Sequence, residues 1–185
     1  MRNITPVAFM LLLGFCLSCT KVSTQEQSST EPFPAPSFEL KDFKTDKVIK
    51  LADFRGKPII INFWFAGCPP CRWEAPGLKR FSEENPDIIV LSITEPELNP
   101  GKAIEQFLDE FGWQFPVLID STGNVTKSFD KNMAYPTTFL VNKELKIVGK
   151  VVSYIEWDTP EMKDVVEHLR NGKLLWYYRY LGRLK

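Results

Sequence analysis

From Ile59 to Cys71 the chain reads IIINFWFAGCPPC, an apolar run followed by two cysteines three positions apart. A buried strand that leads through C-x-x-C into a helix is the geometry of a dithiol redox site. The N-terminus of such a helix supplies unpaired N–H groups and the positive end of the helix dipole, and both favour the thiolate of Cys68. Because the thiolate is the reactive form of cysteine, the pattern predicts that Cys68 and Cys71 form a redox disulfide.

Two other roles for the cysteine pair fit the sequence less well. A structural zinc ion needs four ligands, and the remaining Cys and His residues are Cys16, Cys19 and His168. We therefore expect no metal. A purely structural disulfide is the other alternative, but closing so short a loop removes little entropy from the unfolded chain.

The composition indicates one globular domain without a nucleic-acid partner. The chain has 185 residues, of which 44% are hydrophobic and 25% charged, enough to build a single core. The formal net charge is zero, so the sequence lacks the basic excess that attracts nucleic acids.

The N-terminal segment has the pattern of an export signal. Arg2 precedes an apolar run over residues 7–15, which is too short to span a membrane comfortably. The residues after this run resemble the lipobox of bacterial lipoproteins, and Cys19, which follows Ser18, is the expected lipidation site. Cys16 is a second candidate for lipidation, and a cleaved, soluble secreted product is the alternative outcome.

The sequence divides into four segments. We predict a signal peptide of lipoprotein type over residues 1–18, a flexible tether over residues 19–36 that becomes Pro-rich, and the folded domain over residues 37–170. Residues 171–185 form a basic, aromatic extension. This extension either rests on a membrane surface or a partner, or packs on the domain's own sheet, which is the favoured interpretation.

Hydrophobic periodicity predicts an α/β domain in which a mixed sheet is flanked by helices. The first part of the domain alternates strands and helices, which indicates parallel strands, and a late hairpin adds antiparallel ones. The predicted strands cover residues 37–40, 48–51, 59–65, 88–93, 116–120, 137–141 and 147–152, and the predicted helices cover residues 69–84, 102–111, 125–129 and 160–169.

Four segments together resemble the TlpA/ResA group of membrane-tethered thioredoxin-like proteins, and the resemblance extends over residues 35–170. They are APSFEL at 35–40, LADFRGKP at 51–58, NFWFAGCPPCRWEAP at 62–76 and YPTTFLV at 135–141. The resemblance implies a thioredoxin fold with an N-terminal β-hairpin extension and a family insertion after the second core strand.

The same resemblance implies an activity and a location. It implies a membrane-tethered thiol-disulfide oxidoreductase that faces the periplasm of the bacterial cell envelope. From this and the N-terminal sequence, we expect a lipid anchor to hold it there as a monomer. The resemblance also implies reduction of protein disulfides, including those of apocytochrome c, and re-reduction by a membrane thiol donor of the DsbD/CcdA type. We expect no cofactor other than the redox-active disulfide.

Within the motif, Cys68 is the predicted nucleophile and Cys71 the resolving thiol. Pro69 and Pro70 have no N–H to donate to the Cys68 sulfur, which predicts a thiol pKa that is less depressed and a reducing bias. Glu74 is a candidate for proton transfer to and from the dithiol, and a surface glutamate in the first helical turn is the alternative.

The resemblance adds candidate substrate-binding residues, which are Trp64, Gly67, Pro69, Pro70, Tyr135 and Pro136. Pro136 matches the cis-proline that faces the dithiol in the thioredoxin fold, and a cis bond would expose the backbone of Tyr135 for pairing with substrate. Trp64 matches a usual aromatic position. Gly67 replaces the tryptophan that usually precedes the first cysteine, and we expect it to leave Cys68 more open.

Two alternative functions are compatible with this fold. A peroxiredoxin-type peroxidase needs Thr or Ser three residues before its reactive cysteine, and Phe65 occupies that position. A copper- or thiol-binding module usually needs a His or Met near the cysteines. Met133 is the candidate for that role, because it lies close in sequence to Pro136, which is expected to face the dithiol.

Overall fold

The computed structural model describes residues 32–172, apart from residues 97, 99 and 100. The predicted signal peptide, the candidate lipidation sites Cys16 and Cys19, most of the tether and the extension from residue 173 onward lie outside the described residues.

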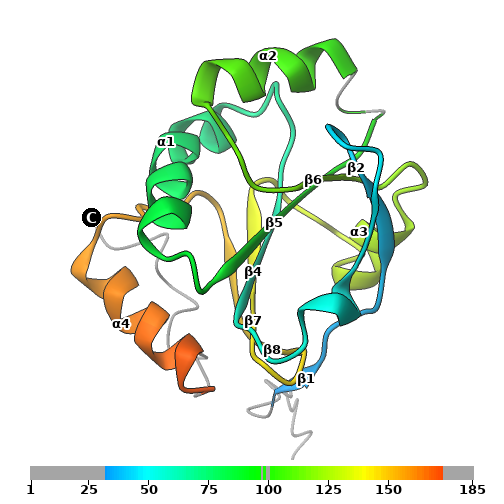
Figure 1. Ribbon diagram of the computed structural model, residues 1–185. Helices are drawn as coiled ribbons and strands as arrows, with labels where there is room; N and C mark the ends of the chain where they lie inside the picture. Colours follow the sequence, from blue (N-terminus) through cyan, green and yellow to red (C-terminus); the bar gives the residue numbers. More distant parts are fainter. Residues whose placement is uncertain (1–31, 97, 99–100, 173–185) are drawn as a thin grey trace, which may run out of the picture.

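The domain is built on one mixed sheet of eight strands (Figure 1). The strand order across the sheet is β1-β8-β7-β4-β5-β6-β2-β3. The strands are β1 (Phe33–Pro34), β2 (Glu39–Asp42), β3 (Val48–Lys50), β4 (Ile59–Phe63), β5 (Ile89–Thr94), β6 (Val117–Ile119), β7 (Thr137–Val141) and β8 (Lys146–Val152). The helices are α1 (Pro69–Glu84), α2 (Gly101–Phe111), α3 (Asn124–Phe129) and α4 (Pro160–Arg170), and a short 3-10 helix covers Leu51–Phe54.

The predicted strand directions are confirmed. β4 pairs in parallel with β5, and β5 pairs in parallel with β6. β7 pairs antiparallel with both β4 and β8. The inserted unit of α2 and β6 follows β5, and the N-terminal hairpin of β2 and β3 joins the sheet through β6.

The central strand β4 is buried on both faces because helices cover both sides of the sheet. Ile60 and Trp64 pack with residues of α1, α2 and α4 in one core. Ile59, Ile61 and Phe63 belong to a second core on the other face, which Phe129 of α3 helps to close. Figure 1 shows α1 and α4 on one side of the sheet and α3 on the other. The alternation along β4 thus places Asn62 on the face that α1 covers.

The predicted tether boundary at residue 36 is wrong. Phe33 and Pro34 form β1, which pairs antiparallel with β8 at one edge of the sheet. Ala35 N adds a hydrogen bond of 2.9 Å to Leu145 O. A proline is tolerated at this position because an edge strand does not need every N–H for the ladder.

Candidate active site

Cys68 and Cys71 form a disulfide at the N-terminus of α1, with their Cα atoms 5.2 Å apart. Cys68 is the N-cap of this helix, and Pro69 and Pro70 occupy its first two positions. The Cys71 N–H donates to the Cys68 Sγ at 3.2 Å. Because the two prolines have no N–H, this amide is the first in α1 that can reach the sulfur.

Both active-site cysteines are buried in the disulfide form. Cys68 is 2% exposed and Cys71 is 1% exposed. Gly67, which we expect to leave Cys68 more open than a tryptophan would, is itself exposed, and that expectation stays a prediction. Beyond its chain neighbours, a Cβ at Gly67 would meet the ring of Phe65 at 3.6 Å, so the missing side chain leaves space beside Phe65.

Glu74 is a buried carboxyl group, which rules out the surface glutamate that was the alternative. Its side chain is 2% exposed. Its Oε1 accepts from Asn62 Nδ2 at 2.8 Å, and its Oε2 accepts from the Ile155 N–H at 3.0 Å. Burial raises the pKa of Glu74 to about 7, although both hydrogen bonds act in the opposite direction.

Further buried polar groups surround Glu74. Asn62 Nδ2 also donates to Thr138 Oγ1 at 3.1 Å, and Asn62 pairs in register with Ser92 on β5. Asn62 Oδ1 and Ser92 Oγ have no hydrogen-bond partner among the described residues. Sequence analysis missed Ser92 and Thr138 as neighbours of the site, although polar residues inside apolar strands are a usable signal.

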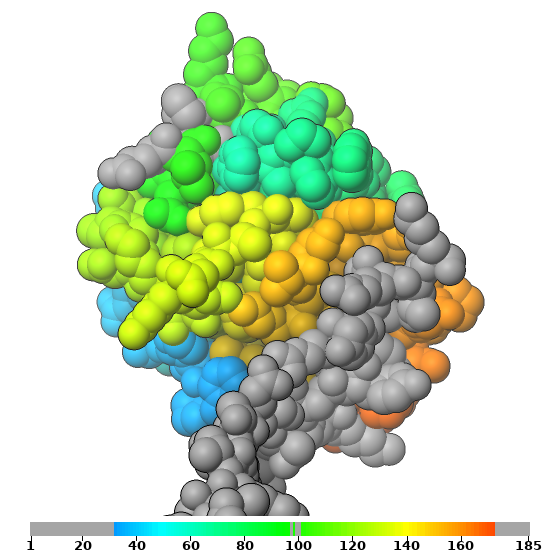
Figure 2. Space-filling model, turned by 180° about the vertical axis from the view of Figure 1, so that it is seen from behind, coloured from blue at the N-terminus to red at the C-terminus, as the bar shows by residue number. Residues whose placement is uncertain are grey.

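The Tyr135–Pro136 peptide bond is cis, as the resemblance implied. Thr137 pairs in register with Phe63 at the end of β4, so Pro136 lies beside the start of the loop that carries Cys68. The Pro136 carbonyl accepts from the Ser153 N–H at 2.9 Å, which ties this segment to the residues that follow β8. In Figure 2 these two stretches, yellow and orange, run side by side below the surface of α1.

Trp64 is not placed to bind substrate. Its side chain is 0% exposed, and its ring packs against Phe107 and Trp113 with centroids 4.3 and 5.0 Å away. The predicted substrate-binding role of Trp64 is therefore wrong, because the helix of the inserted unit covers it. Trp73, two positions after Cys71 on α1, is an exposed aromatic residue: it is 66% exposed and meets Tyr154 edge-on at 5.9 Å.

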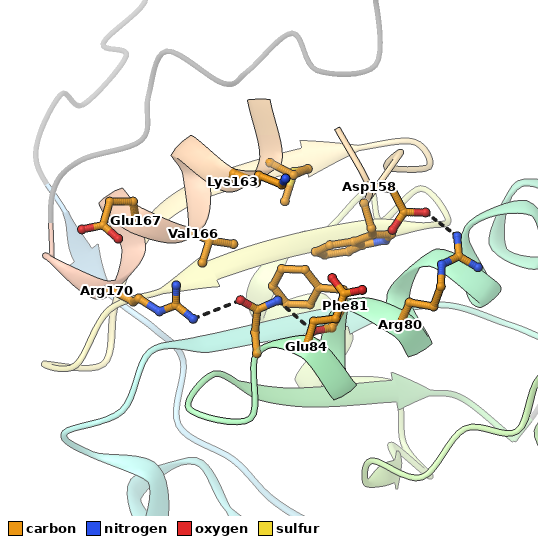
Figure 3. A pocket seen from close by; sticks show the side chains of 11 residues that line it. Arg80, Phe81, Glu84, Asp158, Lys163, Val166, Glu167 and Arg170 are labelled. Carbon is orange, nitrogen blue, oxygen red and sulfur yellow. Dashed lines mark hydrogen bonds and ion pairs between the residues drawn. The ribbon is translucent and has the colours of Figure 1, made fainter. Parts of the chain in front are cut away.

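A separate hollow of about 650 Å³ lies between α1 and α4 (Figure 3). Phe81 and Val166 contribute apolar groups to it, and Arg80 and Asp158 form an ion pair at its edge. It lies along the second half of α1, away from the end that carries Cys68. The ion pair holds the segment before α4 against α1.

Neither a metal cluster nor a membrane-spanning helix is found in the part of the chain that the structure describes. No three or more His, Cys, Asp or Glu side chains gather there in a way that could hold a metal ion. None of the described helices is both long and apolar enough to cross a bilayer.

The fold and this site define a class of protein. A mixed sheet, a C-x-x-C disulfide at the start of the first long helix and a cis-proline beside it are the parts of a thioredoxin-fold thiol-disulfide oxidoreductase.

Comparison with known proteins specifies the family. Residues 33–150 match the AhpC/TSA family. The thiol-disulfide oxidoreductase ResA of Bacillus subtilis is 35% identical over 69% of this chain and 70% of its own length. The ResA of Geobacillus thermodenitrificans is 29% identical over 94% of this chain and 95% of its own. The chain thus belongs to the AhpC/TSA family, among its ResA-type thiol-disulfide oxidoreductases.

A solved structure supports the same fold. The thioredoxin domain of a thiol-disulfide oxidoreductase from Bacteroides vulgatus superimposes with a TM-score of 0.62 at 22% identity. The match covers 74% of this chain and 96% of that one.

Proposed function

We propose that this protein reduces disulfide bonds in exported proteins, with Cys68 and Cys71 supplying two electrons per cycle. The arrangement of Cys68, Cys71 and the buried carboxyl group of Glu74 carries this proposal. It combines an attacking thiol at a helix N-terminus, a second thiol that resolves the intermediate, and a group able to exchange a proton near neutral pH.

The reaction begins with the reduced dithiol. The Cys68 thiolate attacks one sulfur of the substrate disulfide, which forms a mixed disulfide and releases the other substrate sulfur as a thiolate. The Cys71 thiolate then attacks the Cys68 sulfur. This step forms the Cys68–Cys71 disulfide and releases the second substrate thiolate, so two electrons pass to the substrate.

Glu74 is proposed to accept the proton of the Cys71 thiol before that second attack. The two residues are three positions apart on α1, which places them on neighbouring turns of one helical face. With a pKa of about 7, the Glu74 carboxyl group is present in both protonation states near neutral pH. Asn62 and the Ile155 amide hold its two oxygens in place.

The reducing direction is supported by Pro69 and Pro70. A strong oxidant stabilises its reduced form through a highly stabilised thiolate. Here the backbone bond to the Cys68 sulfur comes from Cys71, at 3.2 Å. Fewer donors leave the thiolate less stabilised, which favours giving electrons to the substrate.

Location and partners are proposed on the resemblance and the N-terminal sequence. A lipid on Cys19 would hold the domain at the periplasmic side of a bacterial membrane, as a monomer. Disulfide-containing proteins, including apocytochrome c, would be the substrates. A membrane thiol donor of the DsbD/CcdA type would restore the dithiol after each cycle.

The test is the equilibrium reduction potential of the Cys68–Cys71 pair. A potential near that of thioredoxin, about −270 mV, supports a reductase that needs an electron supply. A potential between about −180 and −120 mV would instead identify an isomerase or an oxidase. Peroxide turnover measured on the same protein tests the peroxidase alternative, which the phenylalanine at position 65 disfavours.

A further inference from the structure

Glu95 and Tyr135 connect two loops beside the dithiol. Glu95 follows β5, and Tyr135 precedes the cis-proline at the start of β7. The Tyr135 hydroxyl donates to Glu95 Oε1 at 2.6 Å. A hydrogen bond to an ionised carboxylate is among the stronger ones that a neutral side chain makes.

The other side of the Glu95 carboxylate packs against a tight turn. Gly123 has φ of +66° and is buried. A Cβ on Gly123 would lie 2.5 Å from Glu95 Oε2, a distance at which one of the two groups has to move. The glycine therefore leaves room for the carboxylate at the position where it meets Tyr135.

The Tyr135 ring also packs against the loop that carries the reactive cysteine. It meets the Phe65 ring edge-on at 5.4 Å, and the Phe65 carbonyl accepts from the Cys68 N–H at 3.1 Å. The hydrogen bond from Tyr135 and this ring contact thus link Glu95 to the backbone of the nucleophile's own loop.

We propose that Glu95 is a positioning residue, which fixes Tyr135 and with it the Tyr135–Pro136 backbone that receives the substrate chain. This inference rests on the proposed function, in which an extended protein segment pairs with that backbone while Cys68 attacks its disulfide. A small disulfide has no such segment. The contribution of Glu95 should therefore depend on the kind of substrate.

The Tyr135 phenol stays protonated and therefore remains a hydrogen-bond donor to Glu95. Burial raises the pKa of the Tyr135 phenol, and the hydrogen bond and charge of Glu95 and the charge of Asp120 raise it further. The described hydrogen bonds of Asp120 go to other groups: its Oδ2 accepts from Thr126 N and Oγ1 at 2.8 and 2.9 Å, and its Oδ1 accepts from Thr122 Oγ1 at 3.4 Å.

The experiment compares two substrates, insulin as a protein disulfide and oxidised glutathione as a small one. The variants are Glu95→Ala, Glu95→Gln, Tyr135→Phe and the double variant Glu95→Ala/Tyr135→Phe. We expect Glu95→Ala and Tyr135→Phe each to lower the ratio of kcat/KM for insulin to that for glutathione by about fivefold, mainly through a higher KM for insulin. The double variant should lower this ratio no further than either single variant, because Glu95→Ala and Tyr135→Phe remove the same hydrogen bond.

Two further variants separate positioning from general stability. Glu95→Gln keeps a neutral acceptor and should show an intermediate ratio. Asp87→Asn removes the ion pair between Asp87, which follows α1, and Arg170 at the end of α4. This variant should keep the wild-type ratio of insulin to glutathione reduction. Thermal unfolding of each variant confirms that it is folded under the assay conditions.

The outcomes distinguish this inference from the proposed function. If wild-type protein reduces insulin but Glu95→Ala and Tyr135→Phe keep the wild-type ratio, the inference is overturned and the reductase function stands. Additive losses in the double variant would also overturn it. A wild-type protein that reduces neither substrate overturns the proposed function and this inference together.

Discussion

Asn62 Nδ2 donates to Glu74 Oε1 at 2.8 Å, and both residues are buried. Asn62 comes from the central strand and Glu74 from the first turns of α1, so the bond joins the two elements that position the dithiol. A buried carboxyl with two donors is poised between its charged and neutral forms, because burial disfavours the charge that the donors favour.

Replacing Glu74 should change how stability depends on pH. Its pKa of about 7 in the folded protein lies above the 4.5 of an unperturbed glutamate. The folded state therefore binds more protons than the unfolded state between these values, and stability falls as the pH rises through this window. The total loss is roughly 3 kcal/mol. Glu74→Gln should abolish this slope, as measured by urea unfolding at pH 5 and pH 8.

The comparison with wild type isolates Glu74 from other groups. The pKa of Asp87 and that of Asp130 are lowered by Arg170 and Lys150, so these two carboxylates add stability that is lost as the pH falls. Both are retained in the variant, and their contribution cancels in the difference. Wild-type and variant stabilities that run parallel from pH 5 to pH 8 would show that Glu74 does not titrate in this range.

The same substitution should slow catalysis at the resolving step. A glutamine cannot take the proton of Cys71, so Glu74→Gln is expected to lower kcat by about 100-fold, the lower end for loss of a general base. The mixed disulfide should accumulate, which acid quenching and mass spectrometry detect. The pH profile of kcat should also lose its change near pH 7. An unchanged rate of resolution would exclude Glu74 as the proton acceptor.

Much of the fold follows directly from local sequence patterns. The all-apolar run in β4, the prolines at the start of α1 and the two late strands around the turn at residues 142–144 each specify their element without help from distant residues. The cysteine pair and the cis-proline were also correctly identified, the latter through resemblance.

The errors concern contacts between segments distant in sequence. Trp64 is buried because α2 and Trp113, some fifty residues later, pack over it. The burial of Glu74 depends on the register that brings Asn62 beside Ser92 and Thr138. The edge strand at Phe33 depends on β8 at the other end of the domain. Periodicity along one segment does not contain this information.

The prolines of the motif should control the reduction potential. In Pro70→His the backbone gains an N–H, and the side chain becomes an imidazole that carries a positive charge when protonated. Both groups stabilise the Cys68 thiolate of the reduced form. We expect the potential to rise by at least about 30 mV, equivalent to about 1.4 kcal/mol. Equilibration with glutathione buffers measures it. Pro76→Ala, inside α1 but exposed, is the matched control and should leave the potential unchanged.

Gly67→Trp should restore the usual family residue at little cost. Gly67 is exposed, its φ is not positive, and a Cβ there meets the Phe65 ring at an ordinary 3.6 Å. We expect a free energy of unfolding within about 0.5 kcal/mol of wild type. The reduction potential should also be retained, because the Cys71 amide that reaches the Cys68 sulfur is untouched. A large loss of stability would mean that the glycine is required by the loop.

Gly123→Ala should lower the free energy of unfolding, in contrast to Gly67→Trp. The positive φ of Gly123 disfavours any side chain, and its Cβ would lie 2.5 Å from Glu95 Oε2. The backbone penalty alone is about 1 kcal/mol, and displacement of the Glu95 carboxylate should weaken its hydrogen bond to Tyr135.

Urea unfolding measures the loss of stability, with Gly67→Ala as the control that should be close to neutral. The ratio of insulin to glutathione reduction measures the weakening of the hydrogen bond between Glu95 and Tyr135. A variant that loses stability but keeps the wild-type ratio would show that the turn supports the fold without supporting the contact between Glu95 and Tyr135.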